Sequence, residues 1–223
     1  MTGKLIIIEA GDGCGKATQT KMLYERLQNE YPQVRKIEFP DYEADGSMAV
    51  RMYLRGDFGQ TADAVNAYAA STFFAVDRYA SFQLKWRTFY EAGGIVIADR
   101  YTTSNMVHQV VKIRDEQKRT EFLNWLDDFE FHRLGLPTPS IVIFLDMPPH
   151  VAHELLLARA NANHAALDIH ERDEKYLEEC YLAYKDIAKR YGWTSVNCAE
   201  NAQPLPMEII HENIYRAVKE ILD

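Results

Sequence analysis

The residues best suited to chemistry lie near the beginning of the chain, where an apolar run meets a glycine-rich turn. Residues 4–18 read Lys-Leu-Ile-Ile-Ile-Glu-Ala-Gly-Asp-Gly-Cys-Gly-Lys-Ala-Thr, and a helical pattern continues to Leu27. Glycines let successive backbone N–H groups turn around an anion, and a helix N-terminus points its free donors and positive dipole end at the same place. Lys16 would add a mobile positive charge. This order of strand, glycine loop and helix predicts a phosphate-binding loop.

The loop departs from the strict phosphate-loop pattern at two positions. Ala10 stands where the first glycine is expected, and Ala17 stands where a hydroxyl that binds magnesium is expected. A glycine-rich turn without a ligand is the alternative. Lys16 argues against that alternative, because a cation at a helix N-terminus is unfavourable unless an anion neutralises it. We predict that eight consecutive residues bind nucleotide phosphates: Gly11, Asp12, Gly13, Cys14, Gly15, Lys16, Ala17 and Thr18.

A second group of candidates, Asp99-Arg100-Tyr101, follows an apolar run near the middle of the chain. In a doubly wound sheet, ligands bind beyond the carboxyl ends of the strands, so this tripeptide would lie beside the phosphate loop. Asp99 can hold Mg²⁺ directly or through water, and the Arg100 guanidinium can bind a phosphate in a forked geometry. An ordinary ion pair is the alternative, and the position of the tripeptide favours the functional interpretation.

Two further patterns combine aromatic and basic residues. Phe39-Pro40-Asp41-Tyr42 follows the second predicted strand, where Pro40 ends the strand and shapes a turn. Phe74 and Arg78 are four residues apart in a helical segment and therefore share one face. A flat ring and a guanidinium one turn apart can stack on a base and bond its edge. A core phenylalanine with an arginine at its rim is the simpler alternative.

The elements that must position these residues alternate between strands and helices. We predict strands at Leu5–Glu9, Val34–Phe39, Gly94–Asp99, Ile141–Asp146 and Thr194–Asn197. We predict helices at Lys16–Glu30, Met48–Leu54, Thr61–Ala92, Asp115–Phe131, Pro149–Ala160, Arg172–Tyr191 and Met207–Leu222. The pattern predicts an α/β fold in which a doubly wound, five-stranded parallel sheet is flanked by helices in three layers. Residues 1–223 read as a single domain.

Composition limits the classes of partner. The chain has 223 residues and a formal net charge of -8, so it lacks the broad basic surface that nucleic acid or an anionic membrane would require. Its three cysteines, Cys14, Cys180 and Cys198, form neither a disulfide framework nor a metal motif. No apolar run reaches the length of a membrane span, and no signal peptide is evident. We expect a cytoplasmic protein without nucleic-acid or membrane partners.

Taken in order, these motifs resemble the thymidylate kinase family, and the resemblance extends over essentially the whole chain. It rests on Glu9–Lys16, Phe39-Pro40, Phe74 with Arg78, and Asp99-Arg100-Tyr101 followed by Ser104, His108 and Gln109. Leu134–Pro139 and the lid-like stretch through Asp168–Glu171 are similar too. The resemblance implies a P-loop nucleoside monophosphate kinase that uses Mg²⁺ and transfers the γ-phosphoryl group of ATP to dTMP, giving dTDP.

The resemblance also implies roles for individual residues. Lys16, Asp99 and Arg100 would be catalytic: Lys16 and the loop backbone would hold the ATP phosphates, Asp99 the metal ion, and Arg100 the acceptor phosphate. Asp12 would receive the 3′-hydroxyl of the deoxyribose, while Phe74 would stack on thymine and Arg78 would bond its edge. The acceptor site as a whole would comprise Asp12, Phe39, Tyr42, Phe74, Arg78, Arg100, Ser104, His108 and Gln109.

Several positions depart from the family pattern. Family members carry a mobile arginine either in the phosphate loop after the aspartate, where this chain has Gly13, or in the lid. The lid, predicted at about 160–171, has no arginine between Asn161 and Leu167, although Arg159 and Arg172 flank it. The segment Asn161–Asp168 lacks helical amphipathicity and is the best candidate for a mobile piece, although composition alone favours an ordinary surface loop.

The acceptor side departs from the family as well. Tyr42 replaces an arginine that usually reaches the acceptor phosphate, so Arg51 or Arg55 would have to substitute for it, and His108 replaces an aromatic ring beside the sugar. Two alternatives to dTMP phosphorylation therefore stay open. The first is a kinase for a deoxynucleoside or another monophosphate on the same fold. The second is a nucleotide-binding homologue with impaired catalysis.

The resemblance further implies a homodimer through the predicted helix Thr61–Ala92. This segment carries more aromatic surface than one core face needs, in the side chains Tyr68, Phe73, Phe74, Tyr79, Phe82, Trp86, Phe89 and Tyr90. A helix buried on two sides within one chain would explain the same composition. The implied partners are therefore ATP, dTMP and a second copy of the chain.

Overall fold

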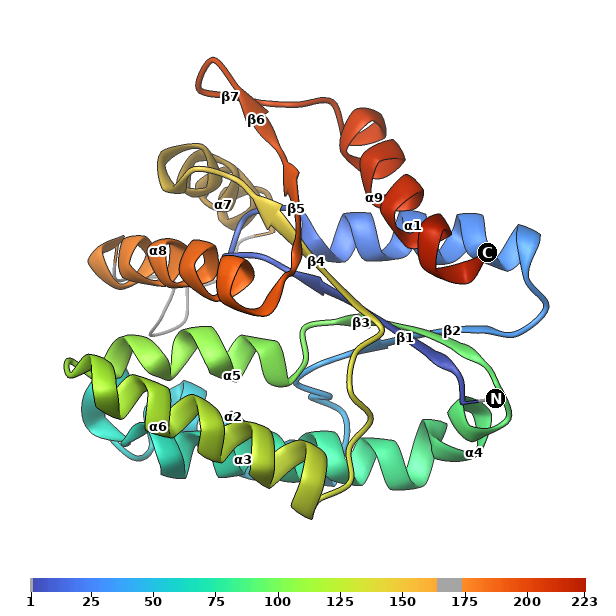
Figure 1. Ribbon diagram of the computed structural model, residues 1–223. Coiled ribbons are helices and arrows are strands. Elements are labelled where there is room, and N and C mark those ends of the chain that lie inside the picture. Colours follow the sequence, from blue (N-terminus) through green and yellow to red (C-terminus); the bar gives the residue numbers. More distant parts are fainter. Residues whose placement is uncertain (1, 164–173) are drawn as a thin grey trace.

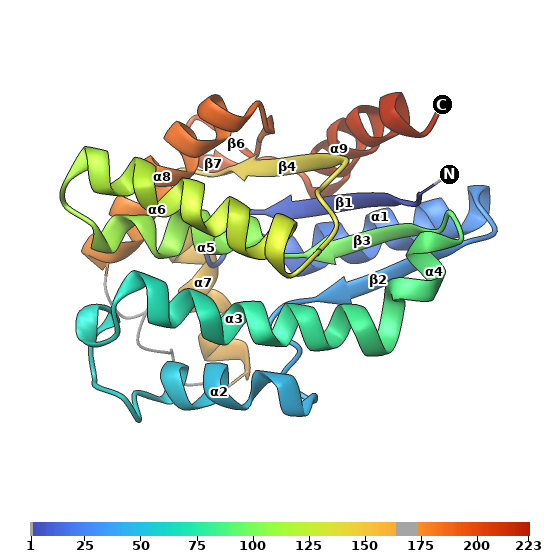
Figure 2. The same ribbon diagram turned by 60° about the horizontal axis from the view of Figure 1, so that its bottom comes forward.

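Five parallel strands form the centre of the protein (Figure 1). The structure is a computed structural model and describes residues 2–163 and 174–223. The strands are β1 (Lys4–Glu9), β2 (Val34–Glu38), β3 (Ile95–Asp99), β4 (Ile141–Asp146) and β5 (Thr194–Asn197). Their order in the sheet is β2-β3-β1-β4-β5, and Figure 2 shows the first four of these side by side. The predicted parallel sheet and its five strands are confirmed, with boundaries within one residue.

Helices cover both faces of this sheet. They are α1 (Lys16–Glu30), α2 (Met48–Arg55), α3 (Ala67–Ser81), α4 (Arg87–Glu91), α5 (Thr102–His108), α6 (Glu116–Asp127), α7 (Pro149–Asn163), α8 (Glu174–Tyr191) and α9 (Met207–Leu222). Helices α1 and α9 lie on one face, and α3, α5, α6 and α8 lie on the other (Figure 1). None of the helices within the described ranges is long and apolar enough to cross a membrane.

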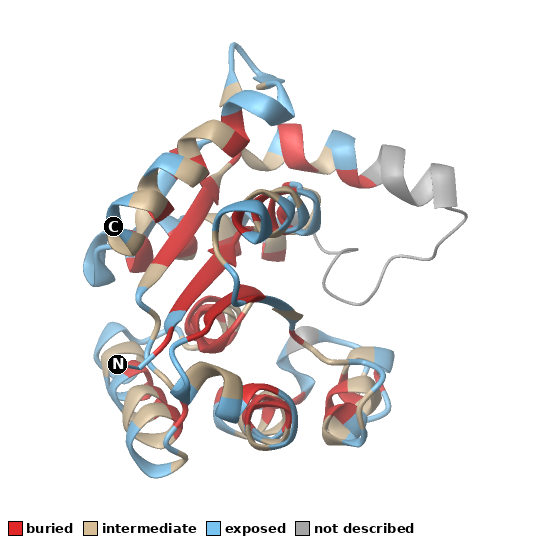
Figure 3. Ribbon diagram, turned by 90° about the vertical axis from the view of Figure 1, so that its right-hand side faces the viewer, coloured by how far each residue is buried: buried red, intermediate tan, exposed pale blue. Residues whose placement is uncertain are grey.

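The alternation of side chains along β1 explains why the sheet must be covered twice. Ile6 and Ile8 pack into the core beneath α1 and α9, whereas Leu5 and Ile7 pack into the core on the opposite face. All four side chains are fully buried, as expected of a central parallel strand. Figure 3 shows the buried residues concentrated on the strands and on the helix faces turned toward them.

The predicted single helix over Thr61–Ala92 is wrong. A 3₁₀ turn at Ala62–Ala64 comes first, and α3 begins only after Asn66, whose side chain accepts a hydrogen bond from the Ala69 N–H at 3.0 Å. The helix then widens into a π-helical turn at Phe82–Trp86 before α4. Asn66 is a strong N-cap residue, and this capping signal outweighs the continuous helical pattern.

Two smaller elements escaped the sequence pattern. Helix α5 follows Tyr101 directly, and a short hairpin pairs β6 (Ala199–Glu200) with β7 (Gln203–Pro204). Helix α6 ends in a π-helical turn at Asp128–Arg133 rather than at Phe131. Helix α5 and the β6–β7 hairpin are short, so neither has enough residues to establish a hydrophobic period. Both α5 and the second π-helical turn contribute to the candidate site.

The strand order places the candidate residues together. Strand β1 lies between β3 and β4, with Ile8 opposite Asp99 on one side and opposite Ile143 on the other. The chain therefore leaves β1 at the point where the order of the sheet reverses, and such a switch point opens a crevice beyond the carboxyl ends of the strands. The loop after β1 and the Asp99-Arg100-Tyr101 segment after β3 meet at this crevice.

Burial of the cysteines makes a prediction about alkaline stability. All three are free and buried, and burial raises the pKa of Cys14 to about 11 and those of Cys180 and Cys198 to about 12. Between pH 9 and 11 the unfolded thiols lose protons that the folded thiols keep, so the free energy of unfolding falls as pH rises. Each thiol contributes at most about 1.4 kcal/mol per pH unit in that range.

Lys112 acts in the opposite direction. Burial lowers its pKa to about 8, so the folded amine loses its proton before the unfolded one, and stability rises with pH above 8. We expect urea unfolding to give a smaller free energy at pH 10 than at pH 8, with Cys198→Ala flattening the decline and Lys112→Met steepening it. An unfolding free energy that is flat across this range in all three proteins would contradict the assignment.

Candidate active site

The glycine loop connects β1 to α1 in the geometry that phosphate binding requires. Gly13 and Gly15 adopt left-handed backbone angles, with φ of 81° and 77°, and α1 begins at Lys16. The Lys16 ammonium donates to the Gly11 carbonyl at 2.8 Å and lies 3.7 Å from an Asp12 carboxylate oxygen. An ammonium carries three donors, so Lys16 can turn from its own loop to an anion seated there.

Gly13 lies against helix α7. A Cβ atom at this position would be 2.4 Å from the Ala152 carbonyl oxygen and 3.1 Å from the Leu156 Cβ. Any side chain at position 13, an arginine included, would therefore meet the backbone of α7. In this structure α7 occupies the space that the side chain of a loop arginine would need.

Replacing Gly13 by Ala tests this contact. Both the left-handed backbone and the collision with Ala152 oppose the new methyl group, so we expect a loss of more than about 2 kcal/mol in unfolding free energy. Gly15→Ala is the matched control, since Gly15 has nearly the same φ but nothing within 4 Å of its added Cβ. Urea denaturation of both variants measures the difference, and equal losses would show that α7 does not confine the loop.

Arg100 brings several predicted residues together. It follows β3 with a left-handed φ of 67°, and its Nη2 atom makes a very short ion pair with Asp12. Its Nη1 atom lies 3.3 Å from Ser104 Oγ and 3.3 Å from His108 Nε2. Three predicted site residues therefore converge on one guanidinium: Asp12 from the phosphate loop, and Ser104 and His108 from the helix after β3.

Glu9, the last residue of β1, is a central residue that the sequence analysis did not assign. Its fully buried carboxylate accepts hydrogen bonds from Thr103 Oγ1 at 2.6 Å, from Ser104 Oγ at 2.9 Å and from the Tyr184 hydroxyl at 3.1 Å. Burial raises the pKa of Glu9, while the Arg100 charge opposes that shift. Glu9 fixes α5 and α8 to the end of β1, and its place at the carboxyl end of an apolar strand was the available signal.

A cavity of about 190 Å³ opens beside Arg100. Every residue predicted for the acceptor site lines this cavity. The full lining comprises Asp12, Phe39, Pro40, Tyr42, Leu54, Phe74, Arg78, Arg100, Tyr101, Ser104, Asn105, His108 and Gln109. Asn105 was not predicted, although it lies between Ser104 and His108 in the same short helix. The side chain of Gln109 is 1% exposed, and no described residue bonds its Oε1 atom. We call this space the acceptor cavity.

Arg78 is less accessible than its predicted role suggests. It is 2% exposed and donates from Nε and Nη2 to the carboxylate of Glu130 at 2.7 and 2.5 Å. Phe74, one turn earlier, meets the ring of Tyr53 edge to face, with 6.2 Å between the ring centroids. These contacts agree with the simpler interpretation of the pair as a core aromatic with an arginine at its rim. Both side chains nevertheless line the acceptor cavity.

A larger groove of about 810 Å³ adjoins the phosphate loop. Residues 12–19 line it at one end, and Leu205, Pro206 and Met207 line another part. It shares Asp12, Phe39, Pro40, Tyr42 and Arg100 with the acceptor cavity. We call this space the donor groove; the two spaces meet where Arg100 and Asp12 lie.

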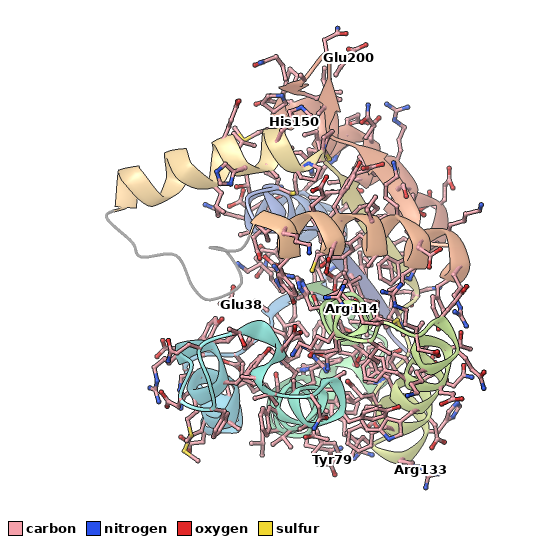
Figure 4. The ribbon with its side chains drawn as sticks, turned by 90° about the vertical axis from the view of Figure 1, so that its left-hand side faces the viewer. Glu38, Tyr79, Arg114, Arg133, His150 and Glu200 are labelled. Carbon is pink, nitrogen blue, oxygen red and sulfur yellow. The ribbon has the colours of Figure 1, made fainter. Side chains whose placement is uncertain are left out.

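Oxygen ligands suited to Mg²⁺ also line the donor groove. Asp99 and Glu38 are paired neighbours at the carboxyl ends of β3 and β2 (Figure 4 labels Glu38). Both line the donor groove, and so does Thr18. No cluster of three or more acidic, histidine or cysteine side chains within residues 2–163 and 174–223 could hold a metal alone. The set fits a hard cation that completes its shell with water and phosphate oxygens.

Two kinds of arginine were expected, one to reach the acceptor phosphate (Arg51 or Arg55) and one to act as the mobile arginine beside the lid. Arg51 donates to the carbonyl oxygens of Tyr42 and Ala44 at 2.7 and 2.9 Å, and Arg55 pairs with Asp57 at 2.8 Å. Neither arginine lines the acceptor cavity. The predicted lid lies outside the described residues beyond position 163, as does Arg172, and the Arg159 side chain is not described either.

Comparison with known proteins agrees with this geometry. A sequence model of the family described as thymidylate kinase matches residues 8–214. The thymidylate kinase of Mycobacterium tuberculosis is 30% identical over 191 residues, covering 85% of this chain and 87% of that protein. The thymidylate kinase of Plasmodium falciparum is 25% identical over 220 residues, covering 98% of this chain and 91% of that protein. The chain belongs to the thymidylate kinase family.

Proposed function

We propose that the protein transfers the γ-phosphoryl group of ATP to dTMP, giving dTDP. The observation that carries this proposal is the meeting of two spaces at Asp12 and Arg100. The donor groove begins at the phosphate loop, where a polyphosphate can bind backbone N–H groups, and the acceptor cavity offers a ring, a carboxylate and two guanidinium groups to a nucleoside monophosphate. A donor and an acceptor bound in these spaces would bring their phosphates together.

The reaction requires positioning and positive charge more than covalent chemistry. Lys16 would leave the Gly11 carbonyl to contact the ATP phosphates, and Arg100 would hold the acceptor phosphate in line with them. Asp99, Glu38 and Thr18 would hold Mg²⁺ directly or through water, and the metal supplies further charge for the phosphate oxygens. Glu9 and Tyr184 would keep Arg100 in place from its buried side.

The acceptor cavity would fix the nucleoside by three kinds of contact. Phe74 would stack on the base, Arg78 would donate to its edge, and Asp12 would accept from the 3′-hydroxyl. Ser104, His108 and Gln109 would line the sugar and base. Phe39 and Tyr42 would close the side that faces the donor groove.

The exposed face of α3 supports a homodimer. Val76 and Tyr79 are 57% and 41% exposed, Leu84 in the following π-helical turn is 83% exposed, and Figure 4 shows Tyr79 at the outer surface. Burying such a face on a second copy would remove apolar area from water. Light scattering should give twice the mass of one chain, and a monomer mass would refute the dimer.

Three free thiols support a reducing compartment such as the cytoplasm.

A screen of acceptors tests the proposal. Purified protein with Mg²⁺ and ATP would be given thymidine, dTMP and other nucleosides and monophosphates, and ADP release would be measured for each. We expect dTMP to be the best acceptor. Phosphorylation of thymidine but not of dTMP would favour the nucleoside kinase alternative, which is based on the departures from the family pattern at Tyr42 and His108. If calorimetry shows binding of ATP and dTMP but no turnover is measured, the protein would be an impaired homologue. That alternative is based on the departures from the family pattern at Gly13 and Ala17.

A further inference from the structure

A fully buried carboxylate, Glu130, lies behind the acceptor cavity without lining it. It comes from the π-helical turn that follows α6, and it accepts from Arg78 Nε at 2.7 Å and Arg78 Nη2 at 2.5 Å. It also accepts from Thr102 Oγ1 at 2.7 Å and, at 3.5 Å, from Asn105 Nδ2. One carboxylate from the second π-helical turn thus contacts two of the cavity-lining side chains, Arg78 and Asn105.

These contacts decide what Arg78 can offer to a ligand. The Nε hydrogen and one Nη2 hydrogen are used by Glu130, and Nη1 makes one long contact of 3.4 Å with the Tyr101 carbonyl. Nη1 carries two hydrogens, so a donor remains for the cavity. Because a guanidinium has no acceptor, Arg78 can present only N–H groups to the edge of a base.

The Glu130 carboxylate, together with the Ser71 carbonyl, decides which end of the Asn105 amide faces the ligand. Asn105 Nδ2 donates to the Ser71 carbonyl at 3.3 Å and points toward Glu130. A carboxylate accepts and does not donate, so the NH₂ end must face it and Oδ1 must point elsewhere. No described residue donates to Oδ1, and this atom is not sealed from solvent like the Gln109 Oε1. Arg78 and Asn105 therefore offer the cavity a donor and an acceptor side by side.

A donor beside an acceptor matches one class of pyrimidine edge. Thymine and uracil present a carbonyl oxygen at C4 and an N–H at N3, which pair with Arg78 and with Asn105 Oδ1. Cytosine presents an amino group at C4 and an acceptor at N3, so both contacts would be reversed. A site built for one hydrogen-bond pattern strongly rejects the analogue that reverses it, because buried polar groups are left without partners.

We propose that Glu130 is a positioning residue that sets the preference for 4-oxo over 4-amino pyrimidine monophosphates by orienting Arg78 and the Asn105 amide. This inference rests on the proposed function, since it concerns the acceptor of that reaction. The competing explanation is that Glu130 only neutralises the buried charge of Arg78. The two explanations differ in the selectivity they predict when the carboxylate is changed.

Glu130→Gln is the first test. Glutamine keeps one acceptor for Arg78, but both carboxylate oxygens of Glu130 accept from Arg78, so the amide NH₂ group of glutamine would face an Arg78 N–H. At the Oε1 position it would also donate toward Asn105 and favour the reversed amide. We expect kcat/KM for dTMP to fall at least tenfold, mainly through KM, while dCMP loses less, so that the dTMP-to-dCMP preference drops at least tenfold. The dTMP-to-dUMP ratio should stay unchanged, because the two bases differ only by a methyl group on another edge.

Asn105→Leu supplies a second test if Glu130→Gln folds poorly. Leucine has a similar shape and removes both ends of the amide. If Oδ1 faces the base, the affinity for dTMP falls at least tenfold and the affinity for dCMP, measured as competitive inhibition, does not fall. An equal loss for both nucleotides, or a larger loss for dCMP, would show that the amide does not have the orientation set by Glu130.

Thr102→Val is the matched control for disturbance of the cluster. It removes one neutral donor to Glu130 and keeps the carboxylate, so the dTMP-to-dCMP preference should match that of the unchanged protein. A Glu130→Gln protein that loses activity equally on dTMP and dCMP would overturn the inference and leave a structural role. A wild-type protein without dTMP turnover would instead overturn the proposed function.

Discussion

Lys16→Met should lower ATP-dependent turnover by about 10³-fold, an effect of the size seen when a group that stabilises transition-state charge is removed. The side chain is only 8% exposed, and its ammonium lies within the loop that the phosphates would occupy. Methionine keeps much of the apolar stem but cannot follow the charge that develops on the transferred group. Backbone N–H groups remain, so we expect kcat to fall far more than the KM for ATP rises.

Lys21→Met is the control for this variant. Lys21 lies on the same helix, its side chain is 67% exposed, and its contact with Glu25 at 3.8 Å is a surface ion pair. Such pairs contribute little to stability, so this protein should keep full activity and its melting temperature. Retained ATP-dependent turnover in Lys16→Met, with Lys21→Met behaving normally, would remove the phosphate loop from the mechanism.

Arg100→Met should lower kcat/KM for the acceptor by about 10²- to 10³-fold. Arg100 lines both the acceptor cavity and the donor groove, and it is the guanidinium on which Asp12, Ser104 and His108 converge. Its loss removes the cation that would bind the acceptor phosphate. It also leaves the buried carboxylate of Glu9 without the nearby charge that opposes its raised pKa.

Steady-state kinetics with varied acceptor and a thermal melt separate these two effects. Arg87→Met is a suitable comparison, because Arg87 makes an exposed pair with Glu91 at 2.8 Å and lies far along the chain from the loop. An Arg100→Met protein with an unchanged KM for the acceptor and an unchanged melting temperature would exclude Arg100 from phosphate binding and from the Glu9 cluster.

Sequence patterns were sufficient for the sheet and for the loop. The apolar runs of β1, β3 and β4 are short, rich in β-branched residues and buried on both faces, which is typical of central parallel strands. The glycines before Lys16 identify the turn. The acceptor residues, by contrast, came from resemblance to a family. Periodicity places Phe74 and Arg78 on one helix face but cannot say whether that face is core or cavity, and the structure shows that it is both.

The residues that sequence analysis missed share a physical cause. Glu130 pairs with Arg78 across 52 positions of the chain, and Glu9 bonds Tyr184 across 175. No local pattern encodes contacts between such distant residues. The turn that carries Glu130 is π-helical, so even a correct helix boundary would give its side chain the wrong direction. Asn105 was nearer to detection, since it lies within the predicted Ser104–His108 segment.

The buried ion pair of Arg78 and Glu130 has a consequence for how this enzyme can diverge. A lineage that exchanged either residue alone would carry an isolated charge in its interior, which typically costs about 3–5 kcal/mol, a large share of the stability of a domain. Descendants with a new acceptor base should therefore show both positions replaced together. Intermediates bearing a single replacement would carry this loss of stability, and natural selection would seldom retain them.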